Sequence, residues 1–297
     1  KRQTATKSEI TTSDELNDYY KATKDEFNNY LEREISKEPQ EIAKLIEKGL
    51  RGGKRLRPIL CKLVSDTLGG DTHLAFECSM ALELLHCGAL IHDDWIDGDK
   101  FRRTAPSLWN ELGPRTSVLV ADFMIATGSL HGAISLDTGK SLARCARNLT
   151  EGAIADFTDK KNYSESVYLD RIKRKTGALY STAAELGALV SPRTDLAPKM
   201  YKYGECVGIL YQITDDYLDL LNSLITKTAV GDLALKIPTL PLTKLSKYPQ
   251  YQEVVDEFIY NGNTEKLISN VEIKHAQEVF DDLIQPWQDM SKKFLED

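Results

Sequence analysis

Residues 74–97 read LAFECSMALELLHCGALIHDDWID, and this stretch decides the fold class. Its apolar residues recur at three- and four-residue spacing, which is the pattern of an amphipathic α-helix. Residues 199–221, KMYKYGECVGILYQITDDYLDLL, repeat that pattern and close with a similar acidic cluster. The two stretches therefore predict long helices, each ending at its acidic cluster.

The rest of the sequence also has the pattern of helices joined by short breaks. Segments rich in Ala, Leu, Glu and Lys alternate with short breaks at glycine or proline, and we find no convincing alternating strand pattern. The breaks fall at Arg51–Gly53, Gly69–Gly70, Thr104–Pro106, Gly113–Pro114, Ser191–Pro192 and Lys236–Pro238. Because no Pro/Ser-rich linker and no fixed-period repeat interrupts the pattern, we expect one all-α domain over residues 1–297, with residues 1–40 as a peripheral segment made of a solvated helix and a loop.

Composition excludes several classes of protein. Lys and Arg number 38 against 45 Asp and Glu, a net charge of −7, whereas nonspecific nucleic-acid binding needs a basic face. The longest apolar stretch, Val118–Leu130, is interrupted by Asp122 and is too short for a transmembrane helix. The five cysteines are scattered without a C-x-x-C pair, and the N-terminal residues lack the apolar core of a secretory signal. We therefore expect buried thiols, a cytoplasmic location, no transmembrane segment and no nucleic-acid partner.

The two acidic clusters share the pattern D-D-x-x-D, at Asp93–Asp97 and Asp215–Asp219. Residues four apart lie one turn apart on a helix, so the first and last aspartates of each cluster point the same way. Stacked carboxylates repel one another, and a cation is needed to offset that repulsion. Carboxylate ligands suit Mg²⁺, which takes one or two of them together with substrate phosphates and water. Two such clusters on otherwise apolar helices indicate a metal site rather than two solvated acidic faces.

Basic residues alternate with the acidic clusters along the sequence. They are Lys54, Arg55 and Arg57 beside a glycine pair, Arg102 and Arg103 after the first cluster, Lys173–Lys175, and Lys236. Each group alone is typical of a solvated face, but the alternation favours phosphate groups and metal ions bound between them.

The helix that carries the first acidic cluster has one face suited to an amphiphilic ligand. A stripe about 80° wide on its helical wheel contains Leu82, His86, Ala89, Asp93 and Asp97. Metal ligands therefore stand at the end of the helix, with small or apolar residues below them. A ligand with a charged head and an apolar tail requires this arrangement.

Several motifs together resemble one family. They are GGKRLRP at 52–58, DDWID at 93–97 followed by RR-x-x-P at 102–106, KTGAL at 175–179, and YQ-x-x-DD-x-x-D at 211–219 followed by TLPL at 239–242. In this order they resemble the trans-isoprenyl (polyprenyl) diphosphate synthases, in particular those of the geranylgeranyl type. The resemblance implies an all-α, isoprenoid-synthase-type helical bundle around a deep central cavity, usually as a homodimer. It also implies condensation of isopentenyl diphosphate with an allylic diphosphate, with three Mg²⁺ ions per active site.

The resemblance also implies roles for individual residues. Mg²⁺ would be held by Asp93, Asp97 and Asp215, with support from Asp94, Asp216 and Asp219. The allylic diphosphate would contact Arg102, Lys175 and Lys236. The diphosphate of isopentenyl diphosphate would contact Lys54, Arg57, His86 and Arg103. The carbocation and the allylic chain would be faced by Thr176 and Gln212. Without the motifs, a buried core histidine would be the better interpretation of His86.

Product length depends on the residues below the first acidic cluster. In the family, the positions four and five before the cluster often form the floor of the chain pocket, and here they are the small residues Ala89 and Gly88. The next residues downward are Leu85 and Leu82, about 12 and 16 Å from Asp93 along a helix. We therefore expect a linear all-trans product of C20 or longer, with geranylgeranyl diphosphate first.

One segment departs from the family pattern, and rival functions remain. The family often reads G-x-D-L-x-x-G-K after the second cluster, whereas residues 231–236 read GDLALK and lack the second glycine. A class I terpene cyclase shares the first acidic motif, but its second motif differs and it has no counterpart of Lys54, Arg57 and Arg103. A non-catalytic regulatory subunit of a synthase usually loses one acidic motif. A helical metal-binding scaffold would need neither Gln212 nor Thr176.

Overall fold

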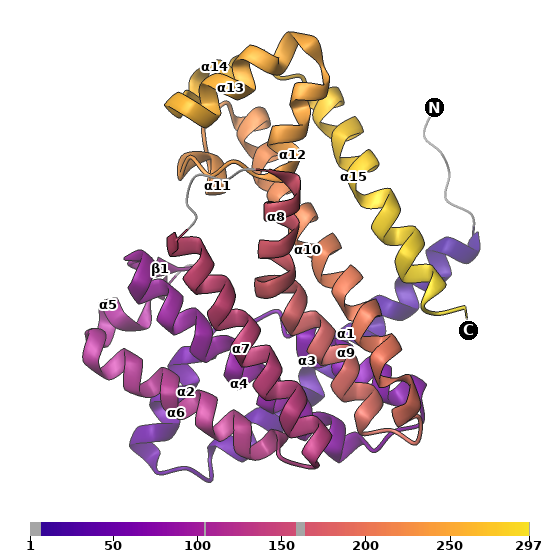
Figure 1. Cartoon of the computed structure of the whole chain (residues 1–297). Helices are drawn as coiled ribbons and strands as arrows, with labels where there is room; N and C mark the ends of the chain where they lie inside the picture. Colours follow the sequence, from indigo (N-terminus) through magenta and orange to yellow (C-terminus); the bar gives the residue numbers. More distant parts are fainter. Residues whose placement is uncertain (1–6, 104, 159–163, 297) are drawn as a thin grey trace. The chain divides into compact units, whose positions relative to one another are not determined.

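The computed structural model describes residues 7–103, 105–158 and 164–296 (Figure 1). The chain forms two compact units. Unit 1 comprises residues 1–146 and 182–198, and unit 2 comprises residues 147–181 and 199–297. Helices α7, α9 and α10 each begin in one unit and end in the other, so neither unit is a continuous stretch of sequence.

Helices account for almost all of the secondary structure in the described residues, as predicted. The elements up to α7 are α1 Lys7–Ile35, α2 Gln40–Gly49, α3 Leu56–Thr67, α4 Thr72–Asp97, β1 Phe101–Arg102, β2 Ala105–Pro106, α5 Leu108–Leu112, α6 Pro114–Gly132 and α7 Leu136–Thr158. They are followed by α8 Glu165–Ile172, the π-helical turn η1 Lys173–Gly177, α9 Ala178–Leu189, the 3₁₀ turn η2 Thr194–Leu196 and α10 Ala197–Thr226. The remaining elements are α11 Gly231–Ala234, α12 Leu240–Thr243, the 3₁₀ turns η3 Lys244–Lys247 and η4 Pro249–Tyr251, α13 Gln252–Asn261, α14 Thr264–Asn270 and α15 Ile273–Lys293.

The two long predicted helices are confirmed as α4 and α10. Helix α4 begins after Asp71, whose side chain accepts a hydrogen bond from the backbone N–H of Leu74 at 2.9 Å, a standard N-cap. It ends at Asp97 because Gly98 follows with φ of 75°, a left-handed conformation that terminates helices. The expected end of the second helix was wrong, since α10 continues from Asp219 to Thr226.

The predicted breaks between helices are confirmed at the described residues, Thr104 lying outside them. The break at 104–106 contains a small hairpin that sequence patterning did not indicate. Strands β1 and β2 pair Phe101 with Pro106 and Arg102 with Ala105, and within the described ranges no other strand occurs.

Helix α1 differs from the solvated segment expected for residues 1–40, of which the first six lie outside the described residues. Its C-terminal half is buried, with Phe27 fully covered and Tyr30 and Leu31 nearly so. These side chains belong to a core cluster of unit 1 that also contains Ile35, Ala43, Ile46, Leu50, Phe76, Met80, Leu84, Cys87, Ile91, Leu108, Val120, Ala121 and Met124. The sequence pattern did not indicate this buried face, because polar residues outnumber apolar ones over the whole of α1.

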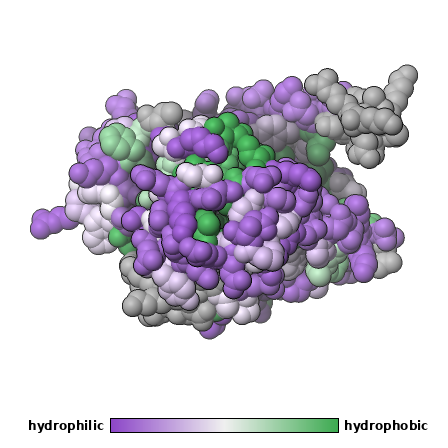
Figure 2. Space-filling view, turned by 90° about the horizontal axis from the view of Figure 1, so that it is seen from above, coloured by the Kyte–Doolittle hydropathy of each residue, from purple (hydrophilic) through white to green (hydrophobic). Residues whose placement is uncertain are grey.

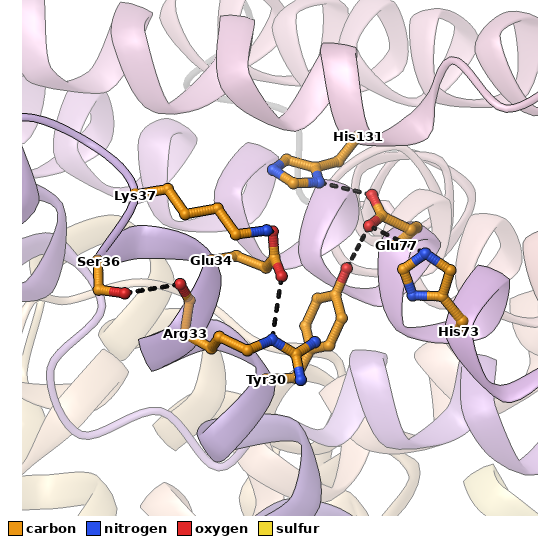
Figure 3. A network of polar contacts seen from close by, with 8 residues as sticks. All are labelled: Tyr30, Arg33, Glu34, Ser36, Lys37, His73, Glu77 and His131. Carbon is orange, nitrogen blue, oxygen red and sulfur yellow. Dashed lines mark hydrogen bonds and ion pairs between the residues drawn. The ribbon is translucent and has the colours of Figure 1, made fainter.

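A polar network joins α1, α4 and α6 beside this core (Figure 3). Glu77 of α4 accepts a hydrogen bond from the Tyr30 hydroxyl and pairs with Nδ1 of His131 at 2.6 Å. His73, one turn earlier on α4, places Nε2 at 3.9 Å from the same carboxylate. Because three helices share one carboxylate, the network holds the ends of α1 and α6 against the start of α4.

Helices α4 and α6 approach closely because each has a glycine at the contact, Gly88 in α4 and Gly128 in α6. A Cβ added at Gly88 would come within 2.9 Å of the carbonyl oxygen of Ala121, and one at Gly128 within 2.8 Å of that of Ala81. Contacts this short are forbidden to real side chains, so larger residues would force the two helices apart. Gly88 is therefore required for the packing of α4 on α6, independently of any ligand.

Unit 2 has its own core around the second half of α10. The largest cluster contains Tyr217, Leu220, Leu224, Leu233, Leu242, Leu245, Tyr251, Val254, Val255, Phe258, Leu267, Ile268, Val271, Ala276 and Val279. A second cluster joins Ile172 of α8 to Ile209 and Ile213 of α10, with apolar residues of α15 packed against it. Helix α10 is thus anchored on both sides of the second acidic motif.

One helix among the described residues, α4, is long and apolar enough to cross a membrane on length and composition alone. Most of its apolar window, 72%, is buried inside the structure, which is the behaviour of a core helix. The surface in Figure 2 is largely hydrophilic, with apolar residues gathered in a few patches.

The buried cysteines lead to a prediction about their reactivity. All five are free and buried, and burial raises the pKa of Cys61 to about 12 and that of Cys145 to about 11. At pH 8 about one such thiol in a thousand or fewer is ionised, and only the thiolate is nucleophilic. We expect iodoacetamide to leave both cysteines unmodified in the folded protein and to modify them in 6 M guanidinium, as read by peptide mass spectrometry. Rapid labelling of either cysteine without denaturant would contradict this expectation.

Candidate active site

The last turn of α4 presents the first acidic motif in unit 1. Asp93 is half-buried and Asp97 is exposed, one helical turn apart, whereas Asp94 is 2% exposed and points inward. The turn is closed by the N–H of Asp99, which donates to the carbonyl oxygen of Asp94 at 2.8 Å. The helix therefore separates the two predicted metal ligands from the predicted supporting residue.

Asp94 is bound by Arg102 of the hairpin that follows. Nε of Arg102 donates to both carboxylate oxygens, at 2.7 and 2.8 Å, and Nη2 adds a further bond. Burial raises the pKa of Asp94 above its usual value, although the guanidinium of Arg102 opposes that shift. The pair fixes Arg102, predicted to contact the allylic diphosphate, directly beside the turn that carries the predicted metal ligands.

His86 on α4 contacts one arginine and lies within the electrostatic influence of three more. Arg57 places Nη1 3.2 Å from Nε2 of His86. Burial lowers the pKa of His86 well below its usual value, and the charges of Arg57, Arg102, Arg103 and Arg55 lower it further. The imidazole is therefore neutral near pH 7, in a concentration of positive charge that suits a polyanion such as a diphosphate.

The backbone is strained at several of these cations. Among the described non-glycine residues, positive φ occurs at Arg55, Arg103, Lys227 and Lys236, with values between 55° and 60°. Two of them, Arg103 and Lys236, are predicted diphosphate contacts. Left-handed backbone is unfavourable for such residues and tends to persist at binding sites, where the fold over-determines it.

In unit 1 the first cationic loop, residues 51–55, contacts the hairpin formed by β1 and β2. Arg103 donates from Nη1 to the carbonyl oxygen of Arg51, and its side chain passes beside Gly52, where a Cβ would lie 3.3 Å from it. Lys54 is exposed, and its carbonyl oxygen accepts a hydrogen bond from the Tyr20 hydroxyl at 2.8 Å. The structure thus brings Arg57, His86 and Arg103 into one region.

The second acidic motif lies on α10 in unit 2. Asp216 is 3% exposed and accepts hydrogen bonds from the Tyr168 hydroxyl and from Nε2 of Gln212, the latter at 2.8 Å. The side-chain oxygen Oε1 of Gln212 in turn accepts a hydrogen bond from the Thr176 hydroxyl at 2.7 Å. These hydrogen bonds link Thr176 to Gln212 and Gln212 to Asp216 of the acidic motif. Thr176 and Gln212 therefore lie together, as their shared predicted role toward the allylic chain requires.

The π-helical turn η1 places Lys175 and Thr176 against α10. Gly208 makes this possible, because a Cβ there would lie 2.8 Å from Cα of Gly177. A π-helical turn inside a helical segment is frequent at functional sites. The turn directs the KTGAL motif at the face of α10 that carries Gln212.

Carboxylates crowd together around this motif. Burial, with neighbouring carboxylates such as Asp215, raises the pKa of Asp216 to about 7, and burial followed by Asp219 and Asp215 raises that of Asp232 to about 6. Asp219 also accepts the N–H of Asp232 at 3.3 Å and so holds the start of α11. Such an excess of negative charge is the environment that a bound cation would stabilise.

Lys236 is placed by its neighbour Gly262 at the end of α13. A Cβ at Gly262 would lie 2.6 Å from Cδ and 3.1 Å from Nζ of Lys236. The stem of Lys236 therefore packs on bare backbone, and its contact with a diphosphate stays a prediction.

Over residues 7–103, 105–158 and 164–296, no group of three His, Cys, Asp or Glu side chains is arranged to hold a metal ion by itself. Mg²⁺ bound by one or two carboxylates takes its remaining oxygens from substrate phosphates and water. The carboxylates present thus fit metal ions that arrive with a diphosphate.

The predicted chain-length residues lie on α4 below the first motif. Leu82 is fully buried, Leu85 is 6% exposed and Ala89 is half-buried. Gly88 lies in the α4–α6 contact, so packing explains its small size. The pocket for the growing chain and the deep central cavity stay predictions.

A family model described as polyprenyl synthetase matches residues 39–275. The chain belongs to the polyprenyl synthetase family. A geranylgeranyl diphosphate synthase of Sulfolobus acidocaldarius is 36% identical over 181 residues, which cover 57% of this chain and 55% of that protein. A geranylfarnesyl diphosphate synthase of Methanosarcina mazei is 33% identical over 178 residues, covering 58% and 59%. The matched region thus spans little more than half the length of these relatives.

Solved structures match over more of their length. A polyprenyl synthase from Caulobacter crescentus, complexed with calcium and isoprenyl diphosphate, superposes with a TM-score of 0.76 at 27% identity. The match covers 93% of this chain and 88% of that one. The polyprenyl synthetase fold is therefore shared almost throughout the chain.

Sequence reasoning missed two side chains that support the candidate site, Tyr168 and Glu83, and it named Arg55 only as one of a basic group. Tyr168 binds Asp216, and Arg55 forms an ion pair with Glu83. One signal was available, since Glu83 is an isolated acid within the apolar run 80–91. An acid in such a run is buried and must be paired.

Proposed function

We propose that this polyprenyl synthetase condenses isopentenyl diphosphate with an allylic diphosphate to give a linear all-trans prenyl diphosphate of C20 or longer. The observation that carries the proposal is the contact of Arg57 with His86, with Arg103 near enough to lower the pKa of that histidine, because these residues offer groups for a second diphosphate in addition to Arg102 beside the first acidic motif. A terpene cyclase needs no such second site. Both acidic motifs are retained, which disfavours a non-catalytic subunit.

We assign the charged residues to the two substrates as follows. Arg102, Lys175 and Lys236 bind the allylic diphosphate, while Lys54, Arg57, His86 and Arg103 bind that of isopentenyl diphosphate. The cations stabilise the negative charge that develops on the leaving diphosphate without any proton transfer. Thr176 and Gln212 orient the allylic chain, and the apolar residues of the run 82–91 keep water away from that chain and the carbocation.

Asp93, Asp97 and Asp215 would hold Mg²⁺, three ions per active site, with substrate oxygens and water as the remaining ligands. Bound Mg²⁺ would supply neutralisation of diphosphate charge. Asp94 keeps Arg102 in place, and Gln212 and Tyr168 orient Asp216.

A homodimer is part of the proposal. Leu119, Phe123 and Leu130 form one exposed stripe on α6, with Leu119 69% and Leu130 79% exposed. Exposed apolar stripes of this kind mark interfaces between proteins. Sedimentation equilibrium should give twice the chain mass for the wild type, and a monomer at all concentrations would reject this part.

A product assay tests the activity itself. The purified protein is incubated with Mg²⁺, labelled isopentenyl diphosphate and dimethylallyl, geranyl or farnesyl diphosphate, and the dephosphorylated products are sized by chromatography. Linear alcohols of C20 or longer support the proposal. Cyclic hydrocarbons formed without isopentenyl diphosphate would identify a cyclase, and folded protein without any product would identify a non-catalytic subunit.

Replacing Ala89 by phenylalanine is expected to shorten the product to C15. Ala89 lies one turn below Asp93 and is half-buried, so an aromatic ring there would block the growing chain. The same assay gives the product distribution, with the rate of the first condensation as control. An unchanged product length at normal rate would show that the chain does not pass Ala89.

A further inference from the structure

Arg55 forms a buried ion pair within the first cationic loop. Nη1 of Arg55 lies 2.5 Å from Oε1 of Glu83, and the two side chains are only 10% and 4% exposed. Nη2 donates to the carbonyl oxygen of Leu50 at 2.8 Å, and Nε donates to Oδ1 of Asn28 at 3.2 Å. One guanidinium therefore ties together α1, the end of α2, the start of α3 and the middle of α4.

The local backbone is built around this contact. Arg55 is the N-cap residue of α3 and has φ of 58°, so its side chain turns back across the preceding glycine. A Cβ at Gly53 would overlap the Arg55 guanidinium and would lie 3.0 Å from Oε1 of Glu83. Gly53 is therefore needed to let the pair form.

The ion pair lies close in sequence to three residues that are assigned to the diphosphate of isopentenyl diphosphate. Lys54 and Arg57 flank Arg55 in the sequence, and His86 lies three residues after Glu83 on α4, where it contacts Arg57. A shift of the loop relative to α4 would therefore separate Arg57 from His86.

Helix α4 uses a second buried acid in the same way. Glu83 and Asp94 are three turns apart on one face of the helix, and Asp94 binds Arg102 in the hairpin that carries Arg103. Each acid holds one arginine of one cationic segment. The spacing of the two segments along α4 is thereby determined by the helix itself.

We propose that the Arg55–Glu83 ion pair is a positioning device for the site that binds the diphosphate of isopentenyl diphosphate. The inference rests on the proposed function. Arg55 does not contact the ligand itself, because its guanidinium is directed at Glu83, Leu50 and Asn28. It acts by holding Lys54 and Arg57 in register with His86.

The test measures binding of isopentenyl diphosphate by isothermal titration calorimetry and the KM for each substrate. Glu83→Gln keeps the shape of the side chain but removes its charge. We expect the Kd and KM for isopentenyl diphosphate to rise at least 10-fold, while the KM for the allylic diphosphate changes less than twofold. Arg55→Lys, which retains the charge but loses the forked contacts, should give a smaller rise in the same constant and serves if Glu83→Gln does not fold.

Asp66→Asn is the matched control, because Asp66 pairs with another buried cation, Lys62, near the other end of α3. It should lower the melting temperature without changing the Kd. A folded Glu83→Gln or Arg55→Lys variant with wild-type Kd would overturn the proposal, as would equal KM increases for both substrates. If the wild type itself does not bind isopentenyl diphosphate, the proposed function fails instead.

Discussion

Replacing Asp93 by asparagine is expected to lower the rate of prenyl transfer by at least ~10²- to 10³-fold, the usual cost of losing one group that stabilises transition-state charge. Asp93 lies half-buried in the last turn of α4, and asparagine has the same shape, so the fold should be retained. The amide is a much weaker ligand for Mg²⁺ than the carboxylate. The measurement is kcat at increasing Mg²⁺, because part of the loss should be recovered at high metal concentration.

Asp99→Asn provides the control for net charge. Asp99 is exposed and lies two residues beyond the end of α4. It loses the same charge in the same neighbourhood and should keep kcat within about twofold, the usual range for exposed charges. Equal losses in the two variants would mean that net charge rather than a specific ligand is responsible.

Replacing Arg102 by glutamine should destabilise unit 1 by ~1–3 kcal/mol, the cost of leaving a buried hydrogen-bonding group without its partner. The reason is Asp94, whose side chain is 3% exposed and would be left without its charged partner. Urea unfolding at pH 7 measures the effect. Activity should be lost as well, because Arg102 is assigned to the allylic diphosphate.

The double variant Arg102→Gln/Asp94→Asn separates the two losses. Two neutral amides can bond to each other without a buried charge, so more than half of the lost stability should return. Activity should not return, since the cation is still missing. A double variant as unstable as Arg102→Gln alone would show that the hairpin, and not the ion pair, is responsible.

The sequence predicted those features that depend on periodicity. Helices α4 and α10 follow from apolar spacing, and the predicted end of α4 at its acidic cluster is confirmed, where Gly98 terminates the helix. The end of α10 was wrong because the acidic motif was taken as a terminus, whereas Leu220 and Leu224 continue the apolar face into the core of unit 2. Helix ends depend on caps and packing rather than on a charged cluster.

Parts of the candidate site were predictable from spacing within one helix. Gln212 and the second acidic motif share a face of α10, and the structure joins Gln212 to Asp216, one turn later. Tyr168 could not be assigned, because its bond to Asp216 links residues that are far apart in the sequence. Partners from different elements depend on packing geometry that periodicity does not contain.

The discontinuity of the two units has a consequence for the order of synthesis. Unit 1 includes residues 182–198, among them the buried Ala183, Ala184 and Leu186, and Gly187 packs against the backbone of Cys61. A ribosome makes residues 147–181, which belong to unit 2, before it makes residues 182–198 of unit 1. A nascent chain therefore holds all the residues of unit 1 only once residue 198 has been added, after the residues of α7 and α8 that belong to unit 2.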